Sequence, residues 1–248
     1  MKLSGHTVLV TGGSAGVGMA LAREFYHRNN QVIICGRNLE RLDRAKQEMS
    51  NLEIIKCDLT KDDEINRLVE TLTDRFSQLS ILVNNAGVQE NYKFTEIEPK
   101  KALAAIDREI MVNFNAVVKL SALCLPILEQ KIESGIINIS SGLALTPKTS
   151  APVYCATKAA VHIFSQSFRY QMEDEAANVK VFEAILPLVD TEMTKGRGKG
   201  KISPQQVADE VFEALKQNNY EIKVGKVKLL IWINRFFPKL AANILRRS

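Results

Sequence analysis

Residues 6–18 read His6-Thr-Val-Leu-Val-Thr-Gly-Gly-Ser-Ala-Gly-Val-Gly18, and this stretch decides how the chain folds. Its first half predicts a short buried strand, and apolar residues recur at helical spacing after the last glycine. Glycines between a strand and a helix permit positive φ and let backbone N–H groups approach a pyrophosphate, while the helix N-terminus adds partial positive charge. An ordinary glycine-rich turn is the alternative, but the context favours a phosphate-binding loop with the candidate residues Gly12, Ser14, Gly16, Val17 and Gly18.

The alternation of strand and helix continues after this stretch. Runs rich in Val, Ile and Leu predict strands at residues 31–35, 53–56, 80–83, 135–139, 179–186 and 220–224. Helical spacing of apolar residues predicts helices over 38–50, 61–77, 99–130, 153–176 and 204–217. Such alternation builds a parallel sheet with helices on both faces, so we predict an α/β fold with one doubly wound sheet in a single domain, residues 1–248.

The second and third predicted strands end in residues suited to an adenosine. In a dinucleotide-binding fold the end of the second strand faces the adenine ribose. Gly36 leaves room there and Arg37 can pair with a 2′-phosphate, so we expect NADP(H) rather than NAD(H); a solvated loop arginine is the alternative. Asp58 follows the third strand and can either accept a hydrogen bond from an adenine amino group or cap the helix that begins near Lys61.

Small and amide side chains follow the fourth predicted strand. Asn85, Ala86 and Gly87 let a cofactor lie against the backbone, although a tight turn explains them equally. Asn113 lies inside the predicted helix 99–130, where an asparagine is unfavourable because its amide needs partners. It is either an exposed or satisfied amide, or it marks a kink that presents a polar group to the site.

Ser141 lies at the carboxyl end of the fifth predicted strand, where open α/β sheets place ligands. Tyr154 and Lys158 follow, four residues apart on one face of the predicted helix 153–176. A phenol has a reference pKa near ~10, and a neighbouring ammonium favours the phenolate, so we expect Lys158 to lower the pKa of Tyr154. The pair is a candidate general acid/base, although a helix can carry such a pair by chance.

Together these motifs closely resemble the short-chain dehydrogenase/reductase family. The resemblance covers the chain from Gly5 to about Val224 and rests on an ordered set: Thr11-Gly12-x-x-x-Gly16-x-Gly18, Asn84-Asn85-Ala86-Gly87, Asn113, Ser141 and Tyr154-x-x-x-Lys158. It implies a Rossmann-type sheet with strand order 3-2-1-4-5-6-7. It also implies hydride transfer between NADP(H) and a small carbonyl or secondary alcohol substrate.

The resemblance gives each of four residues a role. Tyr154 would be the general acid in carbonyl reduction and the base in alcohol oxidation. Lys158 would lower the pKa of Tyr154 and bind the nicotinamide ribose. Ser141 would polarise the substrate carbonyl, and Asn113 would hold a water in the proton relay.

The segment after the sixth predicted strand follows the family only in part. The family usually has Pro-Gly-x-Val-x-Thr, in which Val and Thr contact the nicotinamide carboxamide; Val189 and Thr191 match, but Leu186-Pro187 replaces Pro-Gly. Leu-Val-Asp-Thr at 188–191, together with Asn-Asn-Ala-Gly-Val-Gln at 84–89, resembles the bacterial DltE-like branch, a likeness that does not define the substrate. Family members form dimers or tetramers through the helices corresponding to 99–130 and 153–176, which implies a homo-oligomer.

Composition limits the other functions. The net charge is +5, but removing the six bases from Lys226 onward leaves 27 of 33 bases against 28 acids. The basic charge therefore belongs to the tail and not to a nucleic-acid-binding face. The four cysteines are scattered and do not cluster with the three histidines, so we expect no metal site, no disulfide and a cytoplasmic location. We also expect no signal peptide and no apolar run long enough to cross a membrane.

Two segments lie outside the motifs. Residues 190–203 form the predicted substrate lid, where glycines alternate with bases from Lys195 to Lys201; it either attracts an acidic substrate or is simply a solvated loop. Residues 226–248 form a basic amphipathic tail that Pro238 should break. We expect its apolar side to be buried in the protein or against a second subunit rather than on an anionic membrane surface. Its basic and polar side holds Arg235, Lys239, Asn243 and Arg247, and its apolar side holds Leu229, Ile233, Phe236, Phe237, Leu240 and Ile244.

A non-catalytic dinucleotide-binding sensor or scaffold is the alternative function, because a fold does not guarantee an activity. Such a protein would be expected to lose the tyrosine or the lysine. The chain keeps all four polar groups, so an oxidoreductase is preferred.

Overall fold

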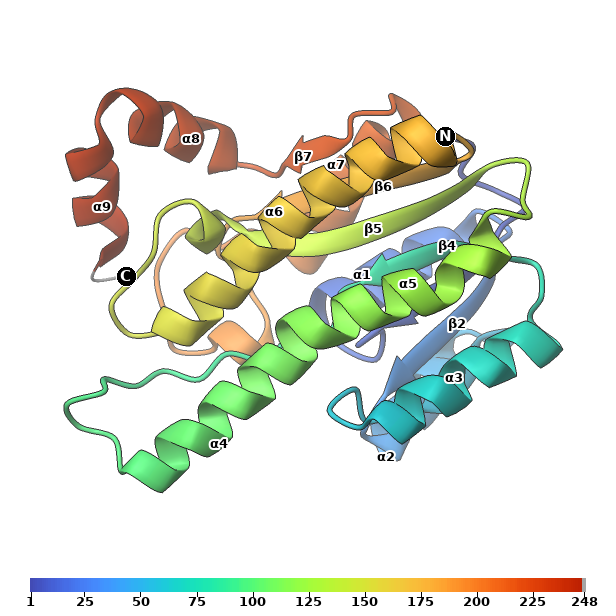
Figure 1. Ribbon diagram of the computed structural model, residues 1–248, viewed down its shortest axis with the longest axis horizontal. Helices are drawn as coiled ribbons and strands as arrows, with labels where there is room; N and C mark the ends of the chain where they lie inside the picture. The colour runs from blue at the N-terminus through green and yellow to red at the C-terminus, as the bar shows by residue number, and fades with distance from the viewer. Residues whose placement is uncertain (247–248) are drawn as a thin grey trace.

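The computed structural model describes residues 1–246 and has one seven-stranded sheet in the order β3-β2-β1-β4-β5-β6-β7, in which every neighbouring pair is parallel (Figure 1). The predicted fold class and strand order are confirmed. The strands are β1 (Thr7–Thr11), β2 (Gln31–Gly36), β3 (Glu53–Lys56), β4 (Leu79–Asn84), β5 (Ser134–Ser141), β6 (Val179–Leu186) and β7 (Glu221–Lys223).

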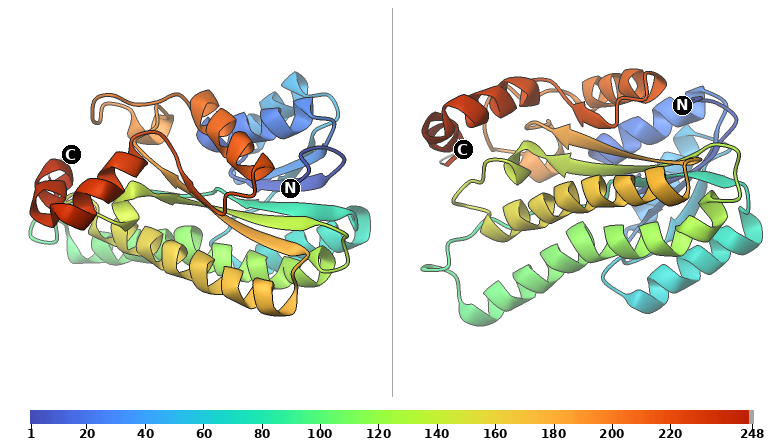
Figure 2. Two further views of the ribbon diagram at one scale, coloured as in Figure 1. Left: turned by 90° about the horizontal axis from the view of Figure 1, so that it is seen from above. Right: turned by 45° about the horizontal axis from the view of Figure 1, so that its top comes forward.

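Helices cover both faces of the sheet, as Figure 2 shows from two sides. One face packs against α1 (Gly16–His27), α2 (Leu39–Glu48) and α7 (Pro204–Lys216), and the other against α3 (Asp62–Arg75), α5 (Ala116–Leu128) and α6 (Pro152–Glu175). Side chains alternate along a strand, so Val8 and Val10 enter the first layer while Leu9 enters the second. Both faces are buried, which explains why the strands are continuous apolar runs.

The predicted helix 99–130 is interrupted. It consists of α4 (Pro99–Ile110), a π-helical turn, η1 (Met111–Asn115), and α5. The expectation that no apolar run could cross a membrane was wrong by length and composition, because Pro99–Leu128 is long and apolar enough. In the structure 44% of its most apolar part is buried, where α5 packs on β4 and β5.

Buried amides tie the central strands together. Asn84 Nδ2 donates to Asn138 Oδ1 at 2.9 Å between β4 and β5, and Asn138 Nδ2 donates to Ser165 Oγ on α6 at 2.9 Å. Asn85 Nδ2 donates to the Thr11 carbonyl at 2.9 Å and so joins the ends of β4 and β1. The parallel strands bring their carboxyl ends to one edge of the sheet, where the predicted site residues lie.

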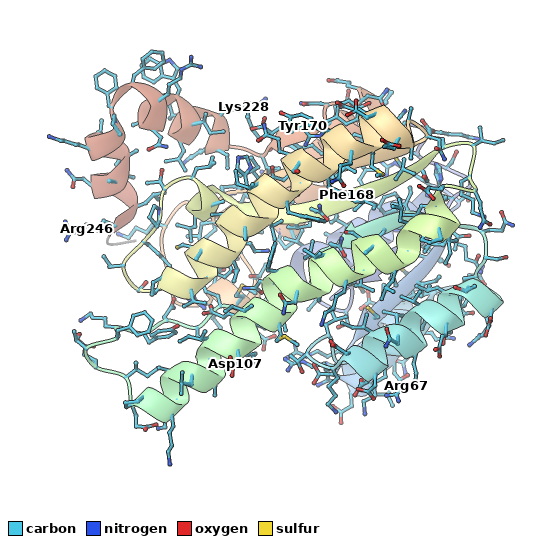
Figure 3. The ribbon with its side chains drawn as sticks, in the orientation of Figure 1. Arg67, Asp107, Phe168, Tyr170, Lys228 and Arg246 are labelled. Atoms are coloured by element: carbon cyan, nitrogen blue, oxygen red, sulfur yellow. The ribbon has the colours of Figure 1, made fainter. Side chains whose placement is uncertain are left out.

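The tail forms α8 (Val227–Phe236) and α9 (Pro238–Arg246), and the helix breaks at Pro238 as predicted. The expectation that its apolar side is buried within the protein was wrong for most of these residues: Leu229, Phe236, Phe237, Leu240 and Ile244 are each more than half exposed in the single chain. Burial against a second subunit stays a prediction. Figure 3 shows Lys228 and Arg246 on this corner, with ring side chains pointing away from the body of the protein. Arg247, which was assigned to the basic side, lies outside the described residues.

Candidate functional site

A cavity of about 1180 Å³ lies at the carboxyl edge of the sheet and extends from the glycine loop to the tail helices. Most of the predicted site residues line it: Gly12, Ser14, Gly16, Val17, Arg37, Asp58, Asn85, Ala86, Gly87, Ser141, Tyr154, Lys158, Val189 and Thr191. Gly18 and Asn113 do not line the cavity and lie behind its wall.

The glycine loop has the geometry that a bound pyrophosphate needs. Gly12 and Gly16 have φ of +64° and +54°, which side chains rarely tolerate. A Cβ on Gly16 would approach Thr191 Cγ2 at 3.1 Å, so the loop closely faces the segment after β6. Gly18 serves packing instead, because its Cβ would lie 2.5 Å from the Gly12 carbonyl oxygen. These residues fit a dinucleotide phosphate at the N-terminus of α1.

Asp58 lies at the far end of the cavity with Gly36 and Arg37. Its carboxylate accepts hydrogen bonds from the Thr60 backbone N–H at 3.0 Å and the Thr60 hydroxyl at 2.9 Å. Partial burial raises the pKa of Asp58, but these bonds and the nearby Arg37 outweigh that effect and hold it below its usual value. The capping interpretation was wrong, because Lys61 occupies the N-cap of α3 and no side chain caps that end. Contact with an adenine stays a prediction.

Sequence reasoning missed an ion pair beside this end of the cavity. Arg41 on α2 binds Glu192 in η3 (Glu192–Thr194) through two hydrogen bonds of 2.7 and 3.2 Å. Both residues line the cavity. The pair joins segments 151 residues apart in the chain, and no local pattern reveals such a contact.

Tyr154, Lys158 and Ser141 lie together in the cavity wall, and all three are buried. Lys158 Nζ lies 5.9 Å from the centroid of the Tyr154 ring and donates to the Ile139 carbonyl at 2.8 Å. Burial lowers the pKa of Lys158 to about 8, although Glu183 acts in the opposite direction. The three side chains thus bring a hydroxyl, a phenol and an amine to one point of the cavity.

The expectation that Lys158 lowers the pKa of Tyr154 was wrong for this structure. Burial raises the pKa of Tyr154 to about 12, and the opposing contributions come from the Ser141 side chain and Arg197. The physical reason is that burial penalises the phenolate, while the Lys158 amine points to a backbone carbonyl.

Asn113 is fully buried in the π-helical turn, and its amide is satisfied. Its Oδ1 accepts from the Val88 N–H at 2.8 Å, and its Nδ2 donates to the Val88 carbonyl at 2.9 Å and to Thr157 Oγ1 at 3.2 Å. It therefore joins the loop after β4 to α6, directly behind Gly87. The sequence left two interpretations of Asn113 open, a satisfied amide or a kink in the helix. The structure shows both at this residue.

Below the site, a buried carboxylate connects two further side chains that the sequence did not single out. Glu183 on β6 is 1% exposed and accepts a hydrogen bond from the Ser140 hydroxyl. His162 Nδ1 lies 2.8 Å from the other Glu183 oxygen, and this contact raises the pKa of His162. The carboxylate thereby supports both the strand that carries Ser141 and the helix that carries Lys158.

The segment after β6 is held at its base. Val189 forms a parallel bridge with Ile202, and Asp190 N–H donates to the Ile202 carbonyl at 2.8 Å. Thr191 and Thr194 form a capping box around η3. Val189 and Thr191 therefore line the cavity from a segment that these bonds hold in place. Leu186 is the last residue of β6, and Pro187 follows it directly.

The other end of the cavity carries residues that the motifs did not identify. Lys148, in the loop between Ser141 and Tyr154, and Arg197, in the predicted lid, line it together with apolar side chains. The apolar group comprises Leu143, Leu188, Leu229, Leu230, Ile233 and Ile244. Within residues 1–246, no group of three or more His, Cys, Asp or Glu side chains is arranged to hold a metal.

Comparisons with known proteins agree with this geometry. The family model described as short chain dehydrogenase matches residues 6–201. A relative from Bacillus subtilis (strain 168), "Uncharacterized oxidoreductase DltE", is 39% identical over 92% of this chain and 91% of its own.

Solved structures resemble the chain over most of its length. A short-chain dehydrogenase from Sphingobium yanoikuyae in complex with NADPH is 25% identical, with a TM-score of 0.78 over 88% of this chain and 87% of its own. A short chain dehydrogenase/reductase from Burkholderia phymatum in complex with NAD has the same fold, with a TM-score of 0.86 at 18% identity over 100% of this chain and 97% of its own. The protein therefore belongs to the short-chain dehydrogenase family and has the fold of its oxidoreductases.

Proposed function

We propose that the protein is an NADP(H)-dependent oxidoreductase that interconverts a carbonyl and a secondary alcohol, with Tyr154 as the general acid/base. The observation that carries this proposal is the meeting of Ser141, Tyr154 and Lys158 in the wall of the cavity that begins at the glycine loop. A bound nicotinamide would supply or accept the hydride.

The side chains of this chain would manage the proton and the charge. In reduction, the Tyr154 phenol donates its proton to the carbonyl oxygen, and the Ser141 hydroxyl donates a hydrogen bond to the same oxygen. Lys158, which points to the Ile139 carbonyl in the cavity wall, binds the nicotinamide ribose. Asn113 fixes the loop behind the site and holds a water for the proton relay.

For the cofactor we propose NADP(H), with NAD(H) as the second candidate. Arg37 lines the cavity beside Gly36, where a 2′-phosphate would lie, and no carboxylate follows β2 directly. The NADPH complex of one structural relative agrees with this choice, and the NAD complex of the other keeps the second candidate. Arg37→Ser should raise KM for NADPH at least about tenfold and leave KM for NADH nearly unchanged, because only NADPH carries the phosphate.

The rival function is a non-catalytic dinucleotide-binding sensor or scaffold. A panel of carbonyl and alcohol substrates, followed by cofactor absorbance with NADPH and NADH in parallel, separates the two. Tyr154→Phe should abolish turnover and leave cofactor affinity nearly intact. Normal turnover by the Phe variant would reject the mechanism, and faster turnover with NADH would reject the cofactor choice.

We further propose a homo-oligomer formed through α4–α6. Large apolar side chains are exposed on these helices: Leu103, Ile110, Leu123, Ile163 and Tyr170. Ile163→Glu should shift the mass measured by light scattering to that of the monomer. An unchanged mass would place the interface elsewhere.

Two further expectations stay predictions: that residues 190–203 form a substrate lid, and that the protein is cytoplasmic.

A further inference from the structure

We propose that Lys148 and Arg197 form an anion-binding subsite beside Tyr154, so that the substrate is a carbonyl compound with an apolar chain and a carboxylate or phosphate group. This inference rests on the proposed function and names the class of substrate for the same cavity. It does not depend on any motif of the family.

Lys148 is a buried cation without a partner. Its side chain lines the cavity and the residue is only 8% exposed. Within residues 1–246, its ammonium has no hydrogen bond and no ion pair. Burial and the nearby Arg197 both lower the pKa of Lys148. The ammonium itself keeps access to the cavity, where a bound anion would supply the partner that the protein does not.

Arg197 presents a second unused donor to the same space. Its Nη2 donates to the Met193 carbonyl, whereas its Nη1 is buried without a hydrogen-bond partner. Arg197, Lys148 and Tyr154 all line the cavity, and the charge of Arg197 lowers the pKa of the other two side chains. An ammonium and a free guanidinium N–H at one place suit a carboxylate or phosphate oxygen.

The acidic residues of the surroundings do not neutralise these cations. Glu192 is bound by Arg41, and Asp190 is bound by Lys201 at 3.2 Å. Glu109 acts on Tyr154 from α4, but burial raises the pKa of Glu109 and favours its neutral form. The positive charge therefore remains available to a ligand.

The subsite belongs to the substrate end of the cavity. Thr149, the residue after Lys148, donates through its N–H and its hydroxyl to the Arg246 carbonyl of α9, at 3.1 and 2.8 Å. The phosphate-binding glycines lie instead at the start of α1. Leucine and isoleucine side chains of the tail line the space around the subsite and suit an apolar chain.

A binding experiment tests the subsite without turnover. Calorimetric titration of hexanoate and hexanol into the protein with bound NADP⁺ should show that the wild type prefers hexanoate at least about tenfold. Lys148→Met should remove that preference. Lys195→Met, a charge loss in the segment that carries Arg197 but outside the cavity lining, should keep it. Equal binding of the two ligands by the wild type would overturn the proposal. A loss of NADPH affinity in Lys148→Met would overturn it too, by assigning the cations to the cofactor.

Turnover of levulinate and methyl levulinate then tests the coupling to chemistry. Wild type should have the higher kcat/KM for the acid, and Lys148→Met should lower that value about tenfold through KM while leaving the ester unchanged. A preference for hexanoate in binding without turnover of either oxo compound would retain the subsite and reject the proposed reaction. Equal kcat/KM for acid and ester would overturn the substrate class.

A second and independent observation is the exposed corner of α8 and α9, from which we infer docking on an anionic lipid bilayer. Four large side chains that do not line the cavity are each more than half exposed there: Trp232, Phe236, Phe237 and Leu240. The Trp232 ring lies 5.4 Å from that of Phe236 and 6.0 Å from that of Phe237, so the aromatic residues form one cluster.

The basic residues around this corner indicate which kind of partner binds there. Lys228, Arg235, Lys239 and Arg246 surround the apolar residues without an ion pair to any residue of 1–246, and no acid follows Glu221 in the sequence. A second copy on the same face, related by a twofold axis, would bring these bases against one another. Anionic headgroups complement the bases, and aromatic side chains suit the boundary with the acyl chains.

Sedimentation with vesicles tests this docking. The full chain should bind phosphatidylglycerol-containing vesicles and dissociate from them at high salt. It should not bind vesicles of pure phosphatidylcholine. Arg235→Glu with Lys239→Glu should weaken partitioning at least about tenfold, whereas Tyr170→Ser on α6 should not. Equal partitioning to both vesicle types would overturn the inference. So would self-association that Trp232→Ser abolishes, because it would assign the corner to a second copy.

Discussion

At the scale of single residues, burial dominates the chemistry of Tyr154. Its phenol has a pKa raised to about 12, so it is protonated at neutral pH and ready to act as an acid. The phenolate needed for alcohol oxidation is scarce under the same conditions. In the role proposed for it, Tyr154 is therefore in the form that donates a proton in carbonyl reduction.

This imbalance predicts the pH dependence of oxidation. The rate of NADP⁺ reduction by a secondary alcohol from the substrate panel should rise roughly tenfold per pH unit from neutral into alkaline solution, because the base form grows in that proportion. Carbonyl reduction should be nearly flat through neutral pH. Initial rates over a pH series check both. If the oxidation rate reached its plateau below neutral pH, the effect of Lys158 on the pKa of Tyr154 would outweigh the effect of burial in the working enzyme.

The contact between Glu183 and His162 gives a prediction for stability. His162→Leu leaves a buried carboxylate without its partner and should lower the free energy of unfolding by about 3 kcal/mol in mildly acidic solution. The pKa of His162 is raised in the folded state, so its contribution is complete below the unfolded pKa and declines as the pH rises through the folded value. Urea unfolding at several pH values measures this decline. If the stability lost in the His162→Leu variant grew with rising pH, the proposed contribution of protonated His162 would be contradicted.

At the scale of elements, the glycine loop depends on close packing as much as on φ. A Cβ on Gly18 would meet a backbone carbonyl at 2.5 Å, whereas one on Gly36 would meet only side chains at 3.7 Å or more. Gly18→Ala should therefore cost about 1–3 kcal/mol of stability and weaken NADPH binding, and Gly36→Ala should change stability little. Thermal unfolding and fluorescence titration of the two variants provide the comparison. Equal stability of the two would contradict the packing role.

The elements show what the sequence could predict and what it could not. Strand and helix periods predicted the parallel sheet, Pro238 the break in the tail, and the motifs most of the cavity lining. The strand order followed from the family resemblance and not from periodicity. The sequence offered a kink at Asn113 as one alternative, but the π-helical turn itself spans only five residues, too few to reveal a change of helical period. Lys148 and Arg197 carry no motif, and only the tertiary fold brings them together. Exposure of the tail also depends on the packing of α8 and α9, which periodicity does not determine.

At the scale of the whole molecule, a bound cofactor should contact residues along most of the carboxyl edge of the sheet and so stabilise the whole fold. The predicted cofactor-binding residues lie on α1 and α6 and in the segments that follow β1, β2, β3, β4 and β6. A ligand that binds only the folded chain adds about 2.7 kcal/mol of stability at a concentration of 100 times its Kd. NADPH should therefore raise Tm by several degrees, and by more than equimolar NADH. An equal shift by both would remove the case for a 2′-phosphate site.

The π-helical turn at Met111–Asn115 also has a meaning for the history of the gene. A π-turn holds one residue more than an α-turn, so it can arise from a single inserted codon. Deleting one of these residues would restore a regular α-helix and leave α4 and α5 in nearly the same relative orientation, because the turn already absorbs the extra residue. Leu103 and Ile110 would then keep their place on the surface proposed for oligomers, while Asn113 would lose the irregular turn that holds it. Relatives with and without this extra residue should therefore share fold and assembly and differ first at the position of Asn113.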